Sequence, residues 1–343
     1  MLITNNQRPG VYSQYDVSSL YAASSSSKYA AVVAKAAGGE ADTPQTFTSY
    51  SKAREVYGPE DRLMLGAISI LLGSGVSRVI AVPVAGDNYS PALAAAASLE
   101  DVGALVCDAE ETSDIKKVLA AVEAASAALR EQIGYCGVGG GAAALAAAGA
   151  LNSERMVICC PASLPLGDTG APSPFFTAAA VAGIVLAADD PVHNFSGLDI
   201  TCLEPPARLA EDQVQELLAG GVTVVEPVGE GVQIVRALTT KAGTDKAMGS
   251  LNTILIIDDV MADTRATLRQ RLRGSRITAH SRDSILAQVM VVLAGKQDDG
   301  IIESFLAPKV YTHEEDPAIC VVELSFQAAH VLSQIHLVAH IQV

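Results

Sequence analysis

The residues most suggestive of chemistry form a turn from Gly137 to Ala142, in which four of six residues are glycine. A turn of this kind between a strand and a helix binds the pyrophosphate of a dinucleotide in many enzymes. The next predicted strand, 156–160, runs into Pro161 and offers no acid that could hold a ribose hydroxyl. We therefore interpret the glycines as a tight turn that lets a helix pack closely on a strand. A cytosolic nucleotide-binding α/β enzyme using residues 137–142 is kept as the alternative function.

Two further patterns could bind a metal ion or transfer a proton. His336 and His340 are four residues apart, the spacing of metal ligands on one helical face. The alternating residues around them predict a strand instead, which would separate them by about 13 Å. His313 and the acidic residues 314–316 precede Pro317, as in a solvated turn. We predict no catalytic residue, no bound metal, no cofactor and no enzyme activity.

Arginine is concentrated in one short region of this acidic chain. Arg265, Arg269 and Arg273 recur every four residues, so a helix would place them on one face. An ordinary solvated face explains this pattern as well as a binding surface does. Because arginine favours ion pairs at interfaces, we treat the three residues as a candidate contact with an acidic partner.

Composition limits the class of protein. The chain has 343 residues, is 50% hydrophobic and carries a net charge of -15, which predicts a substantial core and argues against nucleic acid or an anionic membrane as partner. Its first residues do not resemble a secretion signal, and the most apolar run, 175–188, is shorter than the roughly 20 residues that cross a bilayer. The cysteines lack metal-ligand spacing and predict a reduced, cytosolic protein; they are Cys107, Cys136, Cys159, Cys160, Cys202 and Cys320.

Strands and helices alternate between residues 23 and 235, which is typical of an α/β domain with a mainly parallel sheet. The predicted strands of this region are 29–34, 78–83, 104–107, 133–138 and 156–160, and the predicted helices are 61–72, 113–129, 142–151 and 176–187. Residues 236–325 predict a smaller α+β domain. Its predicted elements are strands 233–238, 253–258, 300–305 and 318–324 and helices 260–273 and 281–294, each helix ended by a glycine, Gly274 or Gly295.

Both ends of the chain predict extended arms, at 1–22 and 326–343. In the C-terminal arm, the apolar residues that alternate with histidine and glutamine are Val331, Ile335, Leu337, Ala339, Ile341 and Val343. The corresponding residues of the N-terminal arm are Pro9, Gly10, Val11, Tyr12, Tyr15 and Val17. Since neither segment has a partner nearby in the sequence, we expect each arm to add a strand to the sheet of another molecule.

Short segments in a fixed order carry a resemblance that spans almost the whole chain. These segments are 8–12 (RPGVY), 151–155 (LNSER), 181–184 (VAGI) leading to 190–191 (DP), 217–223 (LLAGGVT) and 234–240 (IVRALTT), followed by the two-helix region and the alternating C-terminal strand. On these segments the chain resembles contractile tail sheath proteins. That family surrounds the inner tube in contractile phage tails, phage-tail-like bacteriocins and related injection machines.

The resemblance implies a fold and excludes a catalytic inference. In this family the middle domain resembles subtilisin, so we expect a non-catalytic, subtilisin-like α/β domain over residues 23–235. The register that aligns 181–183 with the helix after the subtilisin nucleophile places Phe175 where the serine would stand. The first histidine of the chain is His193, so the order Asp, His, Ser is not met within this region.

The resemblance also implies a structural role. Subunits would polymerise around an inner tube by strand exchange and contract to drive the tube into a target cell envelope. The implied partners are further copies of the chain in stacked hexameric rings, the tube protein, and baseplate and tail-terminator proteins. Assembly would take place in the bacterial host cytoplasm. A strand-swapped adhesin or interaction module is a third possibility.

Overall fold

A nine-stranded sheet forms the centre of the computed structural model, which describes residues 28–188, 190–272, 279–314 and 320–331. Six parallel strands make up its middle, in the spatial order β3 (Val79–Val84), β1 (Tyr29–Lys35), β4 (Val102–Cys107), β5 (Ile133–Gly137), β6 (Met156–Cys160) and β8 (Val222–Val228). Short antiparallel strands flank them, namely β2 (Gln45–Phe47) beside β3, and β9 (Gly231–Arg236) and β7 (Asp199–Ile200) beyond β8. The predicted α/β class with a mainly parallel sheet is confirmed.

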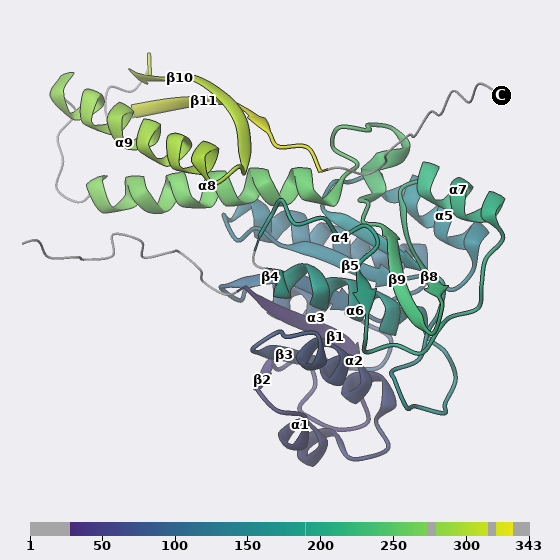
Figure 1. Cartoon of the computed structure of the whole chain (residues 1–343). Coiled ribbons are helices and arrows are strands. Elements are labelled where there is room, and N and C mark those ends of the chain that lie inside the picture. The colour runs from purple at the N-terminus through teal and green to yellow at the C-terminus, as the bar shows by residue number, and fades with distance from the viewer. Residues whose placement is uncertain (1–27, 189, 273–278, 315–319, 332–343) are drawn as a thin grey trace, which may run out of the picture.

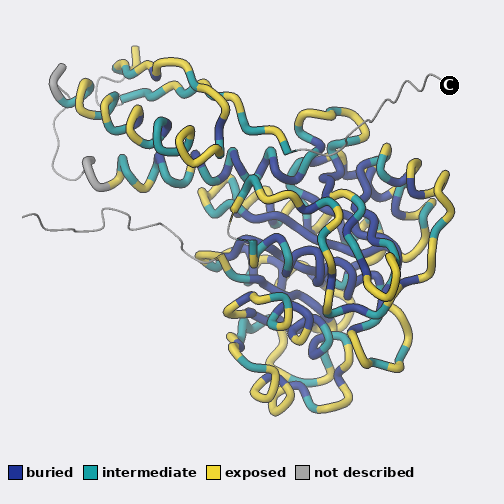
Figure 2. Tube along the Cα trace, viewed as in Figure 1, coloured by how far each residue is buried: buried dark blue, intermediate teal, exposed yellow. Residues whose placement is uncertain are grey.

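Helices cover both faces of this sheet, because its strands are apolar on both sides. One face packs against α1 (Tyr50–Tyr57), α2 (Arg62–Gly73) and α6 (Pro174–Ala187). The other packs against α3 (Ser90–Ala97), α4 (Thr112–Ala127), α5 (Gly141–Leu151) and α7 (Glu211–Ala219). Figure 2 shows that the buried residues are concentrated in this three-layered body.

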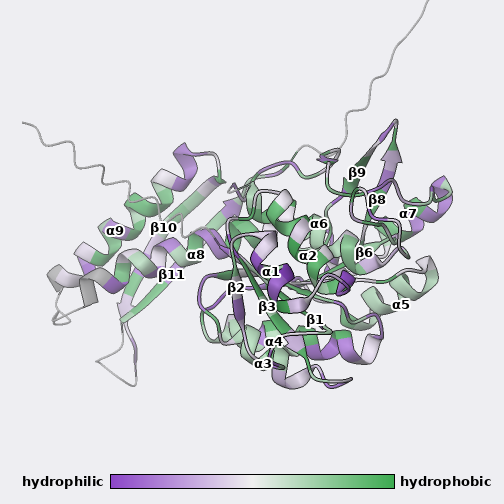
Figure 3. Cartoon of the chain, turned by 90° about the horizontal axis from the view of Figure 1, so that it is seen from below, coloured by the Kyte–Doolittle hydropathy of each residue, from purple (hydrophilic) through white to green (hydrophobic). Residues whose placement is uncertain are grey.

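A smaller C-terminal unit lies beside the body (Figures 1 and 3). It follows a single 3₁₀ turn, Thr240–Gly243, and contains the long helix α8 (Leu251–Leu272), helix α9 (Ala279–Asp298) and the antiparallel hairpin β10 (Ile302–Thr312) and β11 (Cys320–Ala328). Its core is small and is formed by Ile256, Val260, Val289, Leu293 and Ile302. The unit is therefore joined to the body mainly through α8.

The predicted strand 253–258 is wrong, because these residues are the beginning of α8. Leu251 and Ile254 of this helix pack into the core of the body, whereas Ile256 and Val260 pack into the core of the C-terminal unit. A helix that is apolar on two faces loses the 3.6-residue period, and its isoleucines then look like a buried strand. Gly295 is likewise not a helix end, since α9 continues to Asp298.

The hairpin corrects the start of the predicted C-terminal arm. β11 continues to Ala328, and its last residues pair with β10 of the same chain, Ser325 opposite Leu306 and Ala328 opposite Ile302. Val331 is described and lies outside any strand. The other C-terminal arm residues, all of the N-terminal arm residues, and the metal-spaced histidines at 336 and 340 lie outside the described residues.

Candidate functional site

Two ion pairs, Arg155–Asp258 and Arg265–Glu131, join the body to α8. Arg155 contributes to this joint from the body, and the local sequence explains its position. Asn152 ends α5 in the left-handed conformation, with φ of 43°. The next residue, Ser153, exchanges hydrogen bonds with the Thr240 hydroxyl at 3.0 and 2.9 Å. Arg155 then lies immediately before β6, facing α8.

Arg155 and Asp258 form a bidentate ion pair between the body and α8. The two terminal guanidinium nitrogens of Arg155, Nη1 and Nη2, each donate to one carboxylate oxygen of Asp258 at 2.7 Å. The side chains are 16% and 4% exposed, so the pair is almost dry. Burial alone would lower the pKa of the Arg155 guanidinium. The hydrogen bonds to Asp258, together with the negative charges of Asp258, Glu131 and Glu154, outweigh burial and raise this pKa.

The next residue of α8 serves a different contact. Asp259 and Asp263 are one helical turn apart and both bind the ammonium of Lys296 on α9, at 2.6 and 2.5 Å. Burial would lower the pKa of Lys296, and the two carboxylates raise it instead. Because one cation serves two acids, Asp259 is only partly compensated, and burial raises its pKa. Adjacent carboxylates of α8 thus bind the helix to two different neighbours.

The arginine face predicted from the sequence is partly engaged within the subunit. Arg265 pairs with Glu131 of the body at 2.5 Å, with side-chain exposures of 24% and 13%. Arg269 is exposed and lines a hollow beside the same part of the body. Arg273 lies outside the described residues. A contact of this face with a tube or neighbouring subunit stays a prediction.

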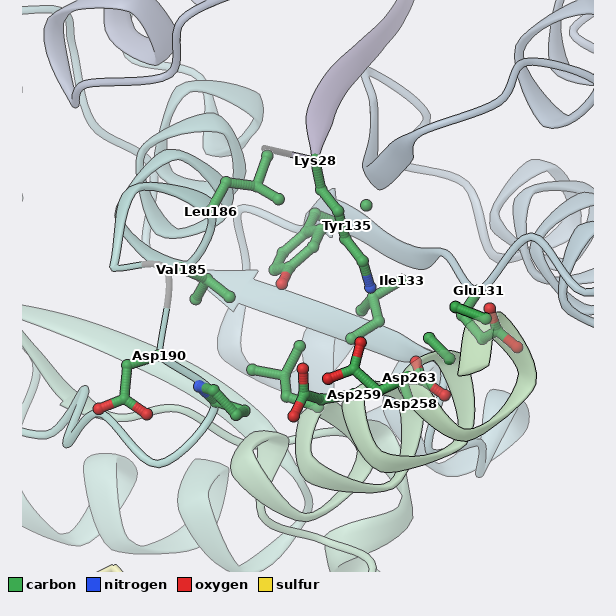
Figure 4. Close-up of a pocket in the computed structure, with 15 residues that line it drawn as sticks. Lys28, Glu131, Ile133, Tyr135, Val185, Leu186, Asp190, Asp258, Asp259 and Asp263 are labelled. Atoms are coloured by element: carbon green, nitrogen blue, oxygen red, sulfur yellow. The ribbon is translucent and has the colours of Figure 1, made fainter. Parts of the chain in front are cut away.

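A cavity of about 260 Å³ lies between α8 and the edge of the body. Its apolar floor includes Val185 and Leu186 of α6, and the carboxylates of Asp259 and Asp263 border it on the α8 side (Figure 4). The Tyr135 hydroxyl points into the cavity from β5, and burial raises the pKa of this hydroxyl. The joint therefore contains both ion pairs and a cavity between α8 and the body.

The glycine turn fits the packing interpretation. A Cβ atom at Gly137 would collide with the backbone of Pro174 and Phe175, where α6 begins. Phe175 itself is 1% exposed and packs in the core beside Phe176, with ring centroids 6.0 Å apart. The glycine at the end of β5 is thus required for the close approach of a helix start.

The crevice at which doubly wound sheets bind ligands lies between β1 and β4, where the strand order reverses. Here the carboxylate of Asp108 reaches into that position and accepts a hydrogen bond from the backbone N–H of Lys35 at 2.9 Å. Burial raises the pKa of Asp108. This acid is used to hold the ends of two strands together.

The remaining predicted features concern metal ligands, membrane spans and cysteines. No group of three histidine, cysteine, aspartate or glutamate side chains among these residues could hold a metal ion, and no described helix is long and apolar enough to span a bilayer. All six cysteines are free thiols. His313 lies exposed in the connection after β10.

Sequence reasoning missed the joint. Arg155 and Asp258 are 103 residues apart, and Glu131 and Arg265 are 134 apart, so no local pattern connects them. One usable signal was present: Asp258 and Asp259 interrupt an otherwise apolar segment, and buried acids need cationic partners.

No protein-family model and no curated protein matches the chain. Solved structures do match over nearly its full length. The sheath of the extracellular contractile injection system PVC, in its contracted state, has a TM-score of 0.77 at 14% identity and covers 99% of both chains.

Two further structures give the same result. The contracted helical sheath of the anti-feeding prophage (AFP) has a TM-score of 0.75 at 14% identity, covering 99% of this chain and 100% of its own. The sheath tail protein from Desulfitobacterium hafniense has a TM-score of 0.71 at 10% identity, covering 94% and 97%. The chain therefore has the fold of contractile tail sheath proteins, as its sequence resemblance implied.

Proposed function

We propose that the protein is a structural subunit of a contractile sheath, which polymerises around an inner tube and contracts to drive the tube into a cell envelope. The main evidence is the structural similarity to assembled sheath subunits, which covers 99% of the chain and includes both the body and the C-terminal unit. These neighbours are structural proteins and not enzymes. The subtilisin-like character and the limits assigned to residues 23–235 and 236–325 belong to the same proposal, supported by the parallel sheet with helices on both faces.

The hairpin supports assembly by strand exchange. β10 and β11 are 11 and 9 residues long, and among the described residues each pairs only with the other. Their outer edges therefore present unpaired backbone groups, which invite strands from another chain. In contrast, the outermost strands of the central sheet have only three and two residues. We infer that two arms of neighbouring subunits pair with the two edges of this hairpin. They are the N-terminal arm, 1–22, and the C-terminal arm, which β11 shortens from 326–343 to the residues after Ala328.

The partners follow from this role. They are further copies of the chain in stacked rings, a tube protein, and proteins that close the sheath at the baseplate and at the opposite end. Assembly in the host cytoplasm, followed by release in a virion tail or tail-like particle, completes the proposal. The net charge of -15 opposes contact between copies, so assembly should weaken at low ionic strength, where repulsion is least screened.

Removal of the arms tests the proposal. The C-terminal deletion should remove 332–343, because a cut at residue 326 would damage β11; the N-terminal deletion should remove 1–20. We expect the full chain to form ribbed tubes or rings in negative-stain electron microscopy and each deletion to remain a folded monomer by circular dichroism and sedimentation. Discrete full-length particles that bind a nucleotide would favour the enzyme alternative, and tubes formed by both deletions would refute strand exchange.

A further inference from the structure

A buried hydroxyl points into the cavity of about 260 Å³ between α8 and the body (Figure 4). It belongs to Tyr135 of β5, a residue that is 1% exposed. Among the described residues, no group forms a hydrogen bond with this hydroxyl. Because a buried hydroxyl without a hydrogen bond is costly, we expect its partner to lie inside the cavity.

The charges around the cavity leave one carboxylate without a cation. The acids that line it are Glu131, Asp190, Asp258, Asp259 and Asp263. Two of them pair with arginines across the joint, and Lys296 alone serves both Asp259 and Asp263. Lys28 lines the cavity as the fourth cation, but no described carboxylate lies within ion-pair distance of its ammonium. Five acids therefore face four cations.

The walls of the cavity are largely aliphatic. Val185 and Leu186 line it from α6, Ile133 from β5 and Leu255 from α8. Aliphatic walls cannot replace the water shell of a bare ion, and no three described side chains of the metal-binding types converge here. The volume is several times that of one water molecule, about 30 Å³, and lies below the roughly 300 Å³ of the smallest ordinary ligand pockets. The space therefore suits a small molecule with an alkyl part.

We propose that this cavity binds a small aliphatic primary amine in its ammonium form. The ammonium donates to the Tyr135 hydroxyl and to the Asp259 carboxylate, which border the same space from β5 and from α8 (Figure 4). The alkyl chain lies against Val185 and Leu186. The bound ligand supplies the missing positive charge and connects the body to α8. The site does not depend on the sheath function, because it requires only the folded subunit.

Ligand-observed NMR of the full chain with n-butylammonium chloride, at constant ionic strength, measures this binding. Tyr135→Phe should weaken the affinity about tenfold or more, because a hydrogen bond to a charged group is lost while the buried ring remains. Lys28→Met should strengthen it severalfold, since the Lys28 ammonium extends toward Asp259 and competes with the ligand. The matched control is Tyr57→Phe, which should leave the affinity unchanged. Tyr57 is 3% exposed, its hydroxyl also lacks a partner among the described residues, and it does not line this cavity.

Two further ligands separate the parts of the recognition. n-Butanol has the alkyl chain without the charge, and tetramethylammonium has the charge without an N–H donor, so both should bind about tenfold more weakly. The proposal is overturned if the wild type binds no butylammonium, if either comparison ligand binds equally well, or if Tyr135→Phe binds like the wild type. Binding in Lys28→Met alone would show that Lys28 itself fills the site and would also overturn it. Since binding is measured whether or not subunits assemble, a failure to form tubes would count against the sheath function alone.

Discussion

The Arg155–Asp258 pair should be the strongest single electrostatic contact at the joint, and replacing Arg155 by methionine tests this. The variant leaves the Asp258 carboxylate, 4% exposed, without a cation. Removal of one partner from a buried pair costs about 3 to 5 kcal/mol, mostly the penalty of the remaining buried charge. At about 2.1 cal/mol/K of unfolding entropy per residue, this loss lowers the melting temperature of a chain of this length by about 4 to 7 °C.

Urea and thermal unfolding of the unassembled subunit measure this loss. The matched control is Arg62→Met, because Arg62 pairs with Asp168 at 2.8 Å with the two side chains 42% and 27% exposed. A pair this open contributes about 0 to 1 kcal/mol. The double variant Arg155→Met with Asp258→Leu should recover most of the stability, since no buried charge remains.

Two results would refute the reasoning. A loss below about 1 kcal/mol in Arg155→Met, equal to that in Arg62→Met, would mean that water reaches Asp258. A double variant no more stable than Arg155→Met would mean that the cost arises from lost packing instead. Amide hydrogen exchange should locate the effect, with faster exchange in α8 of the Arg155→Met protein than of the wild type.

Three further predictions concern single positions. Gly137→Ala should lower the free energy of unfolding in urea by about 1 to 3 kcal/mol, because the new Cβ atom would collide with backbone atoms. The control Gly149→Ala places its Cβ atom in open space on α5 and should raise the free energy of unfolding by about 0.5 to 1 kcal/mol. Equal effects of the two substitutions would contradict the packing interpretation. Burial raises the folded-state pKa of Asp108, so its contribution to stability is lost as the pH rises from about 3.8 through that raised pKa. In urea unfolding, Asp108→Asn should therefore gain stability relative to the wild type as the pH rises above about 3.8, and a difference that does not change with pH would contradict the assignment. Arg269→Glu should change the stability of the subunit by no more than about 0.5 kcal/mol but should impair tube formation. Arg265→Glu, in contrast, should destabilise the subunit itself. Normal tubes formed by the Arg269→Glu protein would contradict a role of Arg269 in contacts between molecules.

Five of the six parallel strands and four of the seven described helices of the body were predicted, because the signals of these elements are local; strand β8 and helices α1, α3 and α7 were not predicted. Buried parallel strands are continuous apolar runs, and the helices between them have clear turns at their ends. The strand 156–160 and the helix starting near residue 142 needed no distant information. The start of helix α8 was mispredicted as a strand because its apolar residues pack into two different cores, and neither core can be inferred from this segment alone.

The end of β11 is a second feature that could not be predicted from the sequence. Alternation continues from β11 into residues beyond it without a proline or glycine, so the sequence contains no mark where pairing inside the chain stops. That point is set by the start of β10 at Ile302, which pairs with Ala328 although it lies far away in the sequence. Long-range pairing decides which residues remain for a partner.

The ion pairs of the joint suggest which contacts would resist motion in the proposed sheath. A strand from a neighbouring subunit that pairs with the hairpin would transmit force to α9 and α8, which pack against the hairpin. Helix α8 contacts the body through the ion pairs Arg155–Asp258 and Arg265–Glu131. Opening the first pair would leave a buried charge at a cost of about 3 to 5 kcal/mol. If the protein is a sheath subunit as proposed, α8 should therefore stay in place on the body while the subunits reorient.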